Sequence, residues 1–172
     1  MSDRRTVLRA WWREHIGARD SSAARALAAR LNRGGGVGIL AERAVFDLAR
    51  SLDLTNAPAV LVPLVQVLAA VRRDEGGALP RRLGGDPPVL STLRFQRLLR
   101  AEGEELAVQI RRALPMVDRA CDVGRLGADL LDWSDRTRAR WAFAYFDAPL
   151  PERLATQTSP ASAGDPDEEE SL

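Results

Sequence analysis

The segment from residue 57 to residue 72 is apolar almost all the way round, and it constrains the fold more than any other part of the chain. A helix without a polar face is stable only where other elements cover it on every side. A bilayer span needs about 20 apolar residues, and this segment is shorter and also contains Pro58 and Pro63. The sequence therefore predicts a buried helix at the centre of a helical bundle.

The remaining sequence has the periodicity of amphipathic helices, and no segment alternates convincingly as a half-buried strand does. Ser21 or Ser22, Ser91 and Asp122 are residue types that cap helix N-termini. Including the central segment, we expect helices over residues 3–16, 21–33, 41–52, 57–72, 91–101, 103–115, 122–131 and 134–146. The predicted fold class is all-α, a compact bundle of about seven to eight helices.

Two segments break this pattern. Residues 74–90 contain four glycines and three prolines, so we expect a long irregular loop, which in a compact domain is often functional or disordered. From Thr156 the chain is polar, proline-containing and acidic, which predicts a disordered tail. The expected organisation is one helical domain over residues 1–153 and an acidic tail over residues 154–172.

The net charge of +1 argues at first against a nucleic-acid partner, but the charge is unevenly distributed. Five acidic residues lie in the last eight positions, so residues 1–153 carry 25 basic and 19 acidic side chains, a net charge of +6. All 25 basic residues are arginine, whose planar fork of donors matches phosphate and stacks on bases. Codon bias in a GC-rich genome would produce the same composition, so the bias alone does not establish a function.

Several kinds of chemistry are excluded by missing residues. Without lysine there is no phosphate-loop lysine and no Schiff base. Residues 34–38 are glycine-rich but follow a helix and lack the Gly-Lys-Ser/Thr ending, so we interpret them as a turn. His15 is the only histidine and Cys121 the only cysteine; we expect a surface histidine and a small buried thiol. The spacing of the carboxylates does not suggest general acid–base catalysis. We therefore expect that the protein is not an enzyme and binds no metal or cofactor.

The most informative arginines lie between Ser91 and Ala101, a stretch without an acidic residue. On a helix, Phe95, Leu98 and Leu99 fall on one face, and three arginines fall on the opposite face: Arg94, Arg97 and Arg100. The apolar face would pack on the core while the guanidinium groups project together. A solvated helix face is the alternative, although such a face usually mixes acids with bases.

Other candidate nucleic-acid-binding residues lie on the neighbouring predicted helices: Arg30 and Arg33, Arg111 and Arg112, and Arg136 and Arg138. Arg30 and Arg33 close the second helix, where cations also complement the helix dipole. In the last helix, pairing with Asp132 or Asp135 is an equally good explanation. We expect the aromatic residues near the C-terminus to lie in the core rather than stack on bases: Trp133, Trp141, Phe143, Tyr145 and Phe146.

The order of three motifs resembles the CasB small-subunit family of the type I-E CRISPR Cascade complex. These motifs are Arg-Ala-Trp-Trp at residues 9–12, Arg-Phe-Gln-Arg-Leu-Leu-Arg-Ala followed by Val-Gln-Ile-Arg-Arg-Ala-Leu-Pro, and Leu-Leu-Asp-Trp-Ser-Asp-Arg-Thr-Arg before Phe-Ala-Tyr-Phe. The resemblance covers roughly residues 5–148. The loop at residues 74–90 and the acidic tail have no counterpart that we can assign.

The resemblance implies an all-helical, non-catalytic subunit, present in two copies beside the other Cascade subunits. It implies contacts with the crRNA–target DNA hybrid and with the displaced strand of an R-loop, favouring Arg94, Arg100, Arg111, Arg112 and Arg136, with Arg30 or Arg33. The single cysteine and the arginines that interrupt any leader-like stretch predict a cytoplasmic protein. The alternative function is a helical protein–protein adaptor with a solvated arginine surface; a nuclease is a more distant one.

Overall fold

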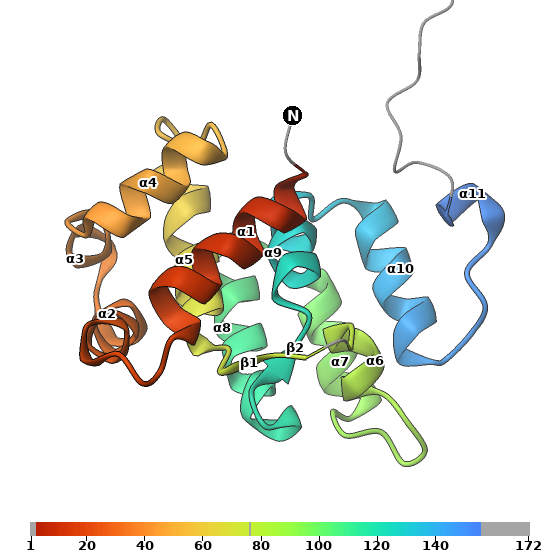
Figure 1. The fold of residues 1–172 in the computed structure, drawn as a ribbon. Coiled ribbons are helices and arrows are strands. Elements are labelled where there is room, and N and C mark those ends of the chain that lie inside the picture. The colour runs from red at the N-terminus through yellow and green to blue at the C-terminus, as the bar shows by residue number, and fades with distance from the viewer. Residues whose placement is uncertain (1–2, 76, 156–172) are drawn as a thin grey trace, which may run out of the picture.

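The computed structural model describes residues 3–75 and 77–155, and the all-α prediction is confirmed (Figure 1). Its eleven α-helices within those ranges are α1 (Arg4–Trp12), α2 (Ser22–Arg33), α3 (Gly36–Leu40), α4 (Arg43–Ser51), α5 (Pro58–Ala70), α6 (Leu79–Leu83), α7 (Thr92–Arg100), α8 (Gly103–Ala113), α9 (Val123–Leu131), α10 (Asp135–Tyr145) and α11 (Glu152–Ala155). A π-helical turn, η1 (Arg13–Gly17), continues α1, and a 3-10 turn, η2 (Leu114–Val117), continues α8.

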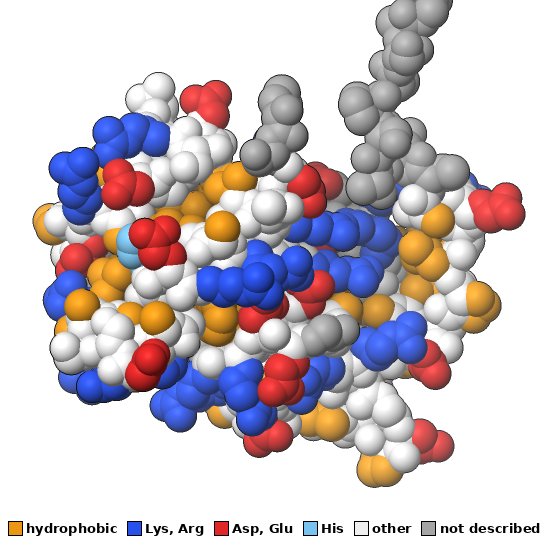
Figure 2. All heavy atoms as spheres, in the orientation of Figure 1, with side chains coloured by type: hydrophobic (Ala, Val, Ile, Leu, Met, Phe, Trp, Pro, Cys, Tyr) orange, Lys and Arg blue, Asp and Glu red, His pale blue; other side chains and the backbone are white. Residues whose placement is uncertain are grey.

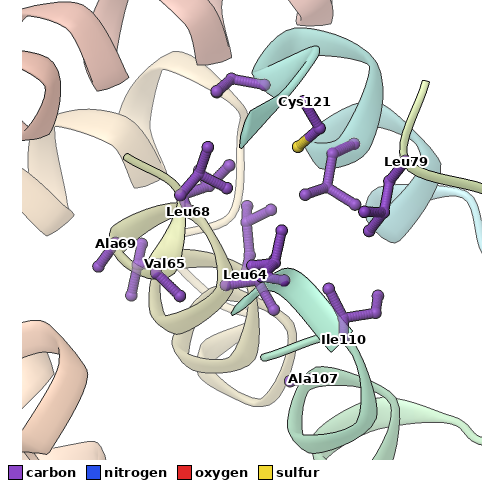
Figure 3. Packing of buried hydrophobic residues seen from close by; sticks show 14 of the residues in the cluster. Leu64, Val65, Leu68, Ala69, Leu79, Ala107, Ile110 and Cys121 are labelled. Atoms are coloured by element: carbon purple, nitrogen blue, oxygen red, sulfur yellow. The ribbon is translucent and has the colours of Figure 1, made fainter. Parts of the chain in front are cut away.

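The apolar segment forms α5, and it lies in the interior as its composition predicts. Helices α2, α3, α8 and α9 all pack against it. Figure 3 shows Leu64 and Leu68 of α5 turned toward the same interior as Ile110 of α8, with the Cys121 sulfur directed into it. These residues belong to one continuous apolar cluster that extends from Leu8 to Tyr145. The domain therefore has a single core, organised around α5.

The predicted helix starts are well supported by capping hydrogen bonds. The side chain of Ser21 accepts a hydrogen bond from the Ala24 backbone N–H, that of Ser91 from Arg94, that of Asp122 from Arg125, and that of Ser134 from Thr137. Each of these bonds satisfies a backbone donor that the first turn of a helix leaves without a partner. Local sequence thus fixes where α2, α7, α9 and α10 begin.

The expected helix count was too low because three helices are only four or five residues long. α3 begins at Gly36, inside the segment that we interpreted as a turn, and α6 lies inside the predicted loop at 74–90. Leu79 and Leu83 of α6 are buried, and α6 packs against α10. A Cβ at Gly84 would lie 2.0 Å from the Tyr145 carbonyl oxygen, so only glycine permits this close approach. Much of the expected loop is therefore part of the packed domain.

A small parallel sheet also departs from the sequence expectation. Strand β1 (Arg73–Asp74) pairs with β2 (Ala120–Cys121). Two residues are too few to show an alternating pattern, which is why neither strand was predicted. The carboxylate of Asp74 on β1 also forms an ion pair with Arg9 of α1 at 3.0 Å. It accepts a hydrogen bond from the Val123 backbone N–H, also at 3.0 Å. The sheet thereby joins the end of α5 to the start of α9.

The aromatic residues near the C-terminal end of the described chain only partly follow the prediction that they lie in the core. Trp141 and Tyr145 are buried, and the Tyr145 ring stacks on Phe95 of α7 with ring centroids 3.9 Å apart. Phe146, in contrast, is 62% exposed.

No helix in the described part of the chain is long and apolar enough to cross a membrane. Of the expected tail over residues 154–172, residues 156–172 lie outside the described residues.

Candidate nucleic-acid interface

The α7 arginines have the arrangement that helical spacing predicts. Phe95 and Leu98 are each 1% exposed and anchor one face of α7 in the core. On the other face Arg94, Arg97 and Arg100 are all exposed, and no side-chain hydrogen bond or ion pair links their guanidinium groups to other described residues. We call these three residues the α7 arginine face. Its charges are free to meet an external anion.

A second basic surface was not expected in this form. Seven arginines line a hollow of about 560 Å³ between α2, the C-terminal end of α5, α8 and the segment before β2. We call this the arginine hollow; the seven arginines that line it are Arg19, Arg25, Arg33, Arg72, Arg111, Arg112 and Arg119. Alanine, asparagine and valine side chains complete its wall, which contains no carboxylate. Figure 2 shows basic side chains gathered along the lower edge of the molecule, below α2 and β1.

Backbone carbonyl groups hold four of these arginines in place. Three of the interactions are made at the end of α5 or α2: Arg19 donates to Val71 O at 3.3 Å, Arg119 to Ala70 O at 3.5 Å and Arg111 to Asn32 O at 2.7 Å. Arg25 donates to the Arg19 carbonyl oxygen at 2.5 Å. The last carbonyls of a helix lack intrahelical partners and lie at the negative end of its dipole. The C-termini of α2 and α5 therefore attract and orient the cations.

The arginines of the hollow also repel one another. The pKa of Arg19 is lowered by burial and then by the charges of Arg72 and Arg119. The pKa of Arg119 is lowered by burial and then by the charges of Arg72 and Arg111. The Arg19 Nε is buried without a hydrogen-bond partner among the described residues. Positive charge is thus concentrated in the hollow, and no carboxylate in its wall offsets it.

Several arginines outside the hollow and the α7 arginine face are neutralised by carboxylates. Arg9 pairs with Asp74 and with Asp122, and Arg13 pairs with Asp74 at 3.2 Å. Figure 2 shows acidic side chains beside the basic band that crosses the middle of this face. Ion pairs of this kind fix α1 against β1 and α9, and they leave little net charge for a ligand.

Of the other predicted arginines, three line the hollow and the rest make contacts within the chain. Arg33, Arg111 and Arg112 line the hollow. Arg30 forms an ion pair with Glu42, and the hydrogen bond within this pair raises the pKa of Arg30. Arg138 pairs with Glu102 at 2.7 Å and with Asp135 at 3.0 Å, and it lies over the Trp133 ring.

Arg136 has internal contacts as well, because its Nη2 donates to the carbonyl oxygens of Arg153 and Leu154 at 3.2 Å. Its guanidinium therefore holds α11 against α10. Together with Arg30 and Arg138, it makes contacts within the chain that leave these three less available than the α7 arginine face or the hollow.

Sequence analysis missed four arginines of the hollow: Arg19, Arg25, Arg72 and Arg119. Three of them lie in connecting segments outside any regular helix, so a search for arginine-rich helix faces could not find them. The sequence does contain a signal for Arg72, because this residue directly follows the apolar segment that forms α5 and so marks the point where the chain leaves the core. Arg119 carries no local signal, because only the β1–β2 pairing brings it next to Arg72.

The family model for the CRISPR-associated protein Cse2 matches residues 22–146, which contain both arginine surfaces apart from Arg19. The chain belongs to the Cse2 family. This is the CasB family that its three motifs resemble, so that prediction is confirmed. A Cse2 protein of Thermus thermophilus is 40% identical over 58 residues, covering 32% of this chain. The match spans 34% of that relative, about a third of its length.

A solved structure shares the fold over most of the molecule. A chain of the E. coli Cascade complex, crystallised with a PAM-containing double-stranded DNA target, superposes with a TM-score of 0.59 at 21% identity. The superposition covers 84% of this chain and 95% of that one. At this level of identity the likeness concerns the fold.

The residues considered for catalysis or metal binding are not assembled into a site. Cys121 is fully buried, as expected for a small core thiol. His15 is half-buried beside the Trp11 ring, with ring centroids 5.6 Å apart, and Glu14 lies 3.8 Å away. In the described ranges no cluster of three or more histidine, cysteine or acidic residues could hold a metal ion.

Proposed function

We propose that this Cse2-family protein is a non-catalytic structural subunit of a crRNA-guided Cascade surveillance complex in antiviral defence. In this role it binds DNA without reading its sequence, and it stabilises the R-loop and the displaced non-target strand. The observation that carries the proposal is the uncompensated arginine surface of the domain: the α7 arginine face and the arginine hollow both present guanidinium groups without a carboxylate among them. Arginine contacts to phosphates position a nucleic acid but carry no sequence information.

The free energy of R-loop formation is compatible with this role even for a subunit that binds DNA with modest affinity. Forming an R-loop exchanges one duplex for another of similar stability, so protein contacts to the backbone can decide the balance. The guide RNA supplies the sequence specificity. We infer that the partners are the other Cascade subunits, the crRNA–target hybrid, the displaced strand and a second copy of this chain, in the cytoplasm. We also infer that residues 1–153 are the binding domain.

The test of this function uses the α7 arginine face. Arg94→Glu with Arg100→Glu removes two free cations and should weaken binding of a single-stranded oligonucleotide. Contacts to single strands contribute about 0.7 each to the slope of log affinity against log salt, so the slope should fall by about 1.4. In a reconstituted complex, RNA loading should persist while R-loop lifetime shortens.

The structure also indicates that this variant will fold. Arg94 is the third residue after the Ser91 cap, so glutamate there completes a capping box. The matched control is Arg4→Glu with Arg43→Glu, because both residues are exposed and each is the first residue of its helix, where glutamate suits the dipole. Equal weakening by both double variants would mean that only net charge matters. Unchanged binding by the α7 variant, with a flat salt titration of the unaltered protein, would favour the adaptor function.

A further inference from the structure

We propose that the α7 arginine face is the docking surface of an acidic segment of the same chain, residues 165–170, which occupies the face when no nucleic acid is bound. The occupant is a peptide with five carboxylates, so its docking makes it an internal competitor of DNA. The docking itself is independent of the proposed function, whereas its effect on DNA affinity rests on that function.

The first argument is the state of the α7 arginine face. Phe95 and Leu98 fix α7 in the core, so the three guanidinium groups project from a helix that is already in place. No carboxylate of a described residue forms an ion pair with them, and Glu102, which lies just after α7, is paired with Arg138 at 2.7 Å. Arginine matches the geometry of a carboxylate as well as that of a phosphate. The face is therefore suited to a carboxylate-rich peptide.

The second argument is the composition of the acidic segment. Five of its six residues are acidic: Asp165, Asp167, Glu168, Glu169 and Glu170. Like charges this close in sequence repel one another, and such runs are often interaction tails. Residues 156–171 contain no large apolar side chain, so ion pairs rather than apolar burial have to hold the segment. Contact with three arginines would relieve the repulsion between the carboxylates.

The third argument is the place from which the segment departs. The described part of the chain ends at Ala155 in α11, which Arg136 of α10 holds through two backbone carbonyls at 3.2 Å. The Tyr145 ring of α10 also stacks on Phe95 of α7, so the same helix contacts both α11 and α7. Asp165 follows Ala155 by ten residues. Ten residues span at most about 35 Å, and a domain of this size has a radius of gyration of about 15 Å. The segment is therefore long enough to reach the face.

The arginine hollow is the less suitable surface for this segment. No residue of α10 or α11 lines the hollow, and four of its arginines already donate to backbone carbonyls. Exposed ion pairs are individually weak and are screened by salt. A tether of this length compensates, because it keeps the two partners at an effective concentration on the order of millimolar.

Docking is tested without nucleic acid, by NMR of the full chain with a spin label at Ser171→Cys. The native Cys121 thiol is fully buried, so the label attaches to the introduced cysteine. At low salt the label should broaden the backbone amide signals of α7 more than those of α2. The broadening should vanish at about 1 M salt, where the Debye length is about 3 Å.

The control for this experiment is an amide-tail variant of the full chain. It carries five substitutions: Asp165→Asn, Asp167→Asn, Glu168→Gln, Glu169→Gln and Glu170→Gln. With the same label, its α7 signals should stay sharp at low salt. The proposal is overturned if the native chain shows no broadening of α7, if the broadening is centred on the hollow, or if the amide-tail variant retains it.

Competition with DNA is tested by anisotropy with a fluorescent oligothymidine. A face that is occupied about two thirds of the time raises the apparent Kd about threefold, so the amide-tail variant should bind about three times more tightly than the native chain. This gain should disappear in chains that carry Arg94→Gln with Arg100→Gln, and it should remain with the matched pair Arg4→Gln and Arg43→Gln.

The outcomes separate docking from the proposed function. A gain of equal size in all three backgrounds would show that the segment acts only through net charge, and docking would be overturned. If no variant binds the oligothymidine while the broadening of α7 persists, the proposed function fails and the docking stands.

Discussion

At the scale of single residues, Cys121 shows how burial changes chemistry. Burial, followed by the nearby negative charge of Asp122, raises the pKa of its thiol from 9.0 to about 12. The folded state therefore keeps a proton that the unfolded state releases above pH 9, and the free energy of unfolding should fall between pH 9 and pH 12. Urea denaturation at pH 8 and pH 10 would measure this loss, which Cys121→Ala should diminish. In the native protein at pH 8 the thiol should react with a labelling reagent no faster than the domain opens.

At the scale of elements, one buried carboxylate, Asp129, links α9 to α10. Asp129 accepts a hydrogen bond from Trp141 Nε1 at 2.8 Å, and it forms an ion pair with Arg140 at 3.2 Å. Burial raises the pKa of Asp129, while the bond from Trp141 and the charge of Arg140 act in the opposite direction. Asp129→Ala should cost about 1–3 kcal/mol of stability, because the buried indole N–H loses its acceptor.

The conservative variant separates the hydrogen bond from the charge. In Asp129→Asn the amide oxygen can still accept from Trp141, so the loss measured by chemical denaturation should be smaller than for alanine. If asparagine destabilises as much as alanine, the ion pair with Arg140 rather than the indole bond holds α10 against α9.

At the scale of the whole molecule, charge is divided between two parts of the sequence. Residues 156–172 contain five acidic side chains and no basic one, whereas the apolar core of the described residues runs from Leu8 to Tyr145. Deleting residues 156–172 should leave Tm unchanged, and it should tighten oligonucleotide binding because repulsion of the phosphates decreases. Calorimetry and anisotropy on the truncated chain would check both outcomes. A broadened or lowered thermal transition would show that these residues belong to the folded domain.

Local sequence was enough to predict most helices and one of the two arginine surfaces. The buried position of α5 follows from its apolar composition, and the starts of α2, α7, α9 and α10 follow from their capping residues. The α7 arginine face follows from spacing alone, because residues three apart on a short helix share a face. The short α3 and α6 could not be predicted, since a helix of five residues is stabilised by packing rather than by its own propensity.

The sequence by itself thus determined an all-α domain, its central helix, its resemblance to one family and an excess of arginine outside the acidic tail. Only the tertiary structure decided which arginines lie together. Arg19, Arg72, Arg111 and Arg119 come from four separate segments, and they meet because α2 and α8 pack on α5 while β1 pairs with β2. Tertiary packing also decided that Arg30 and Arg138 are ion-paired. The physical reason is that a helix face is set by neighbours a turn apart, whereas a charged hollow is set by long-range contacts that no local pattern encodes.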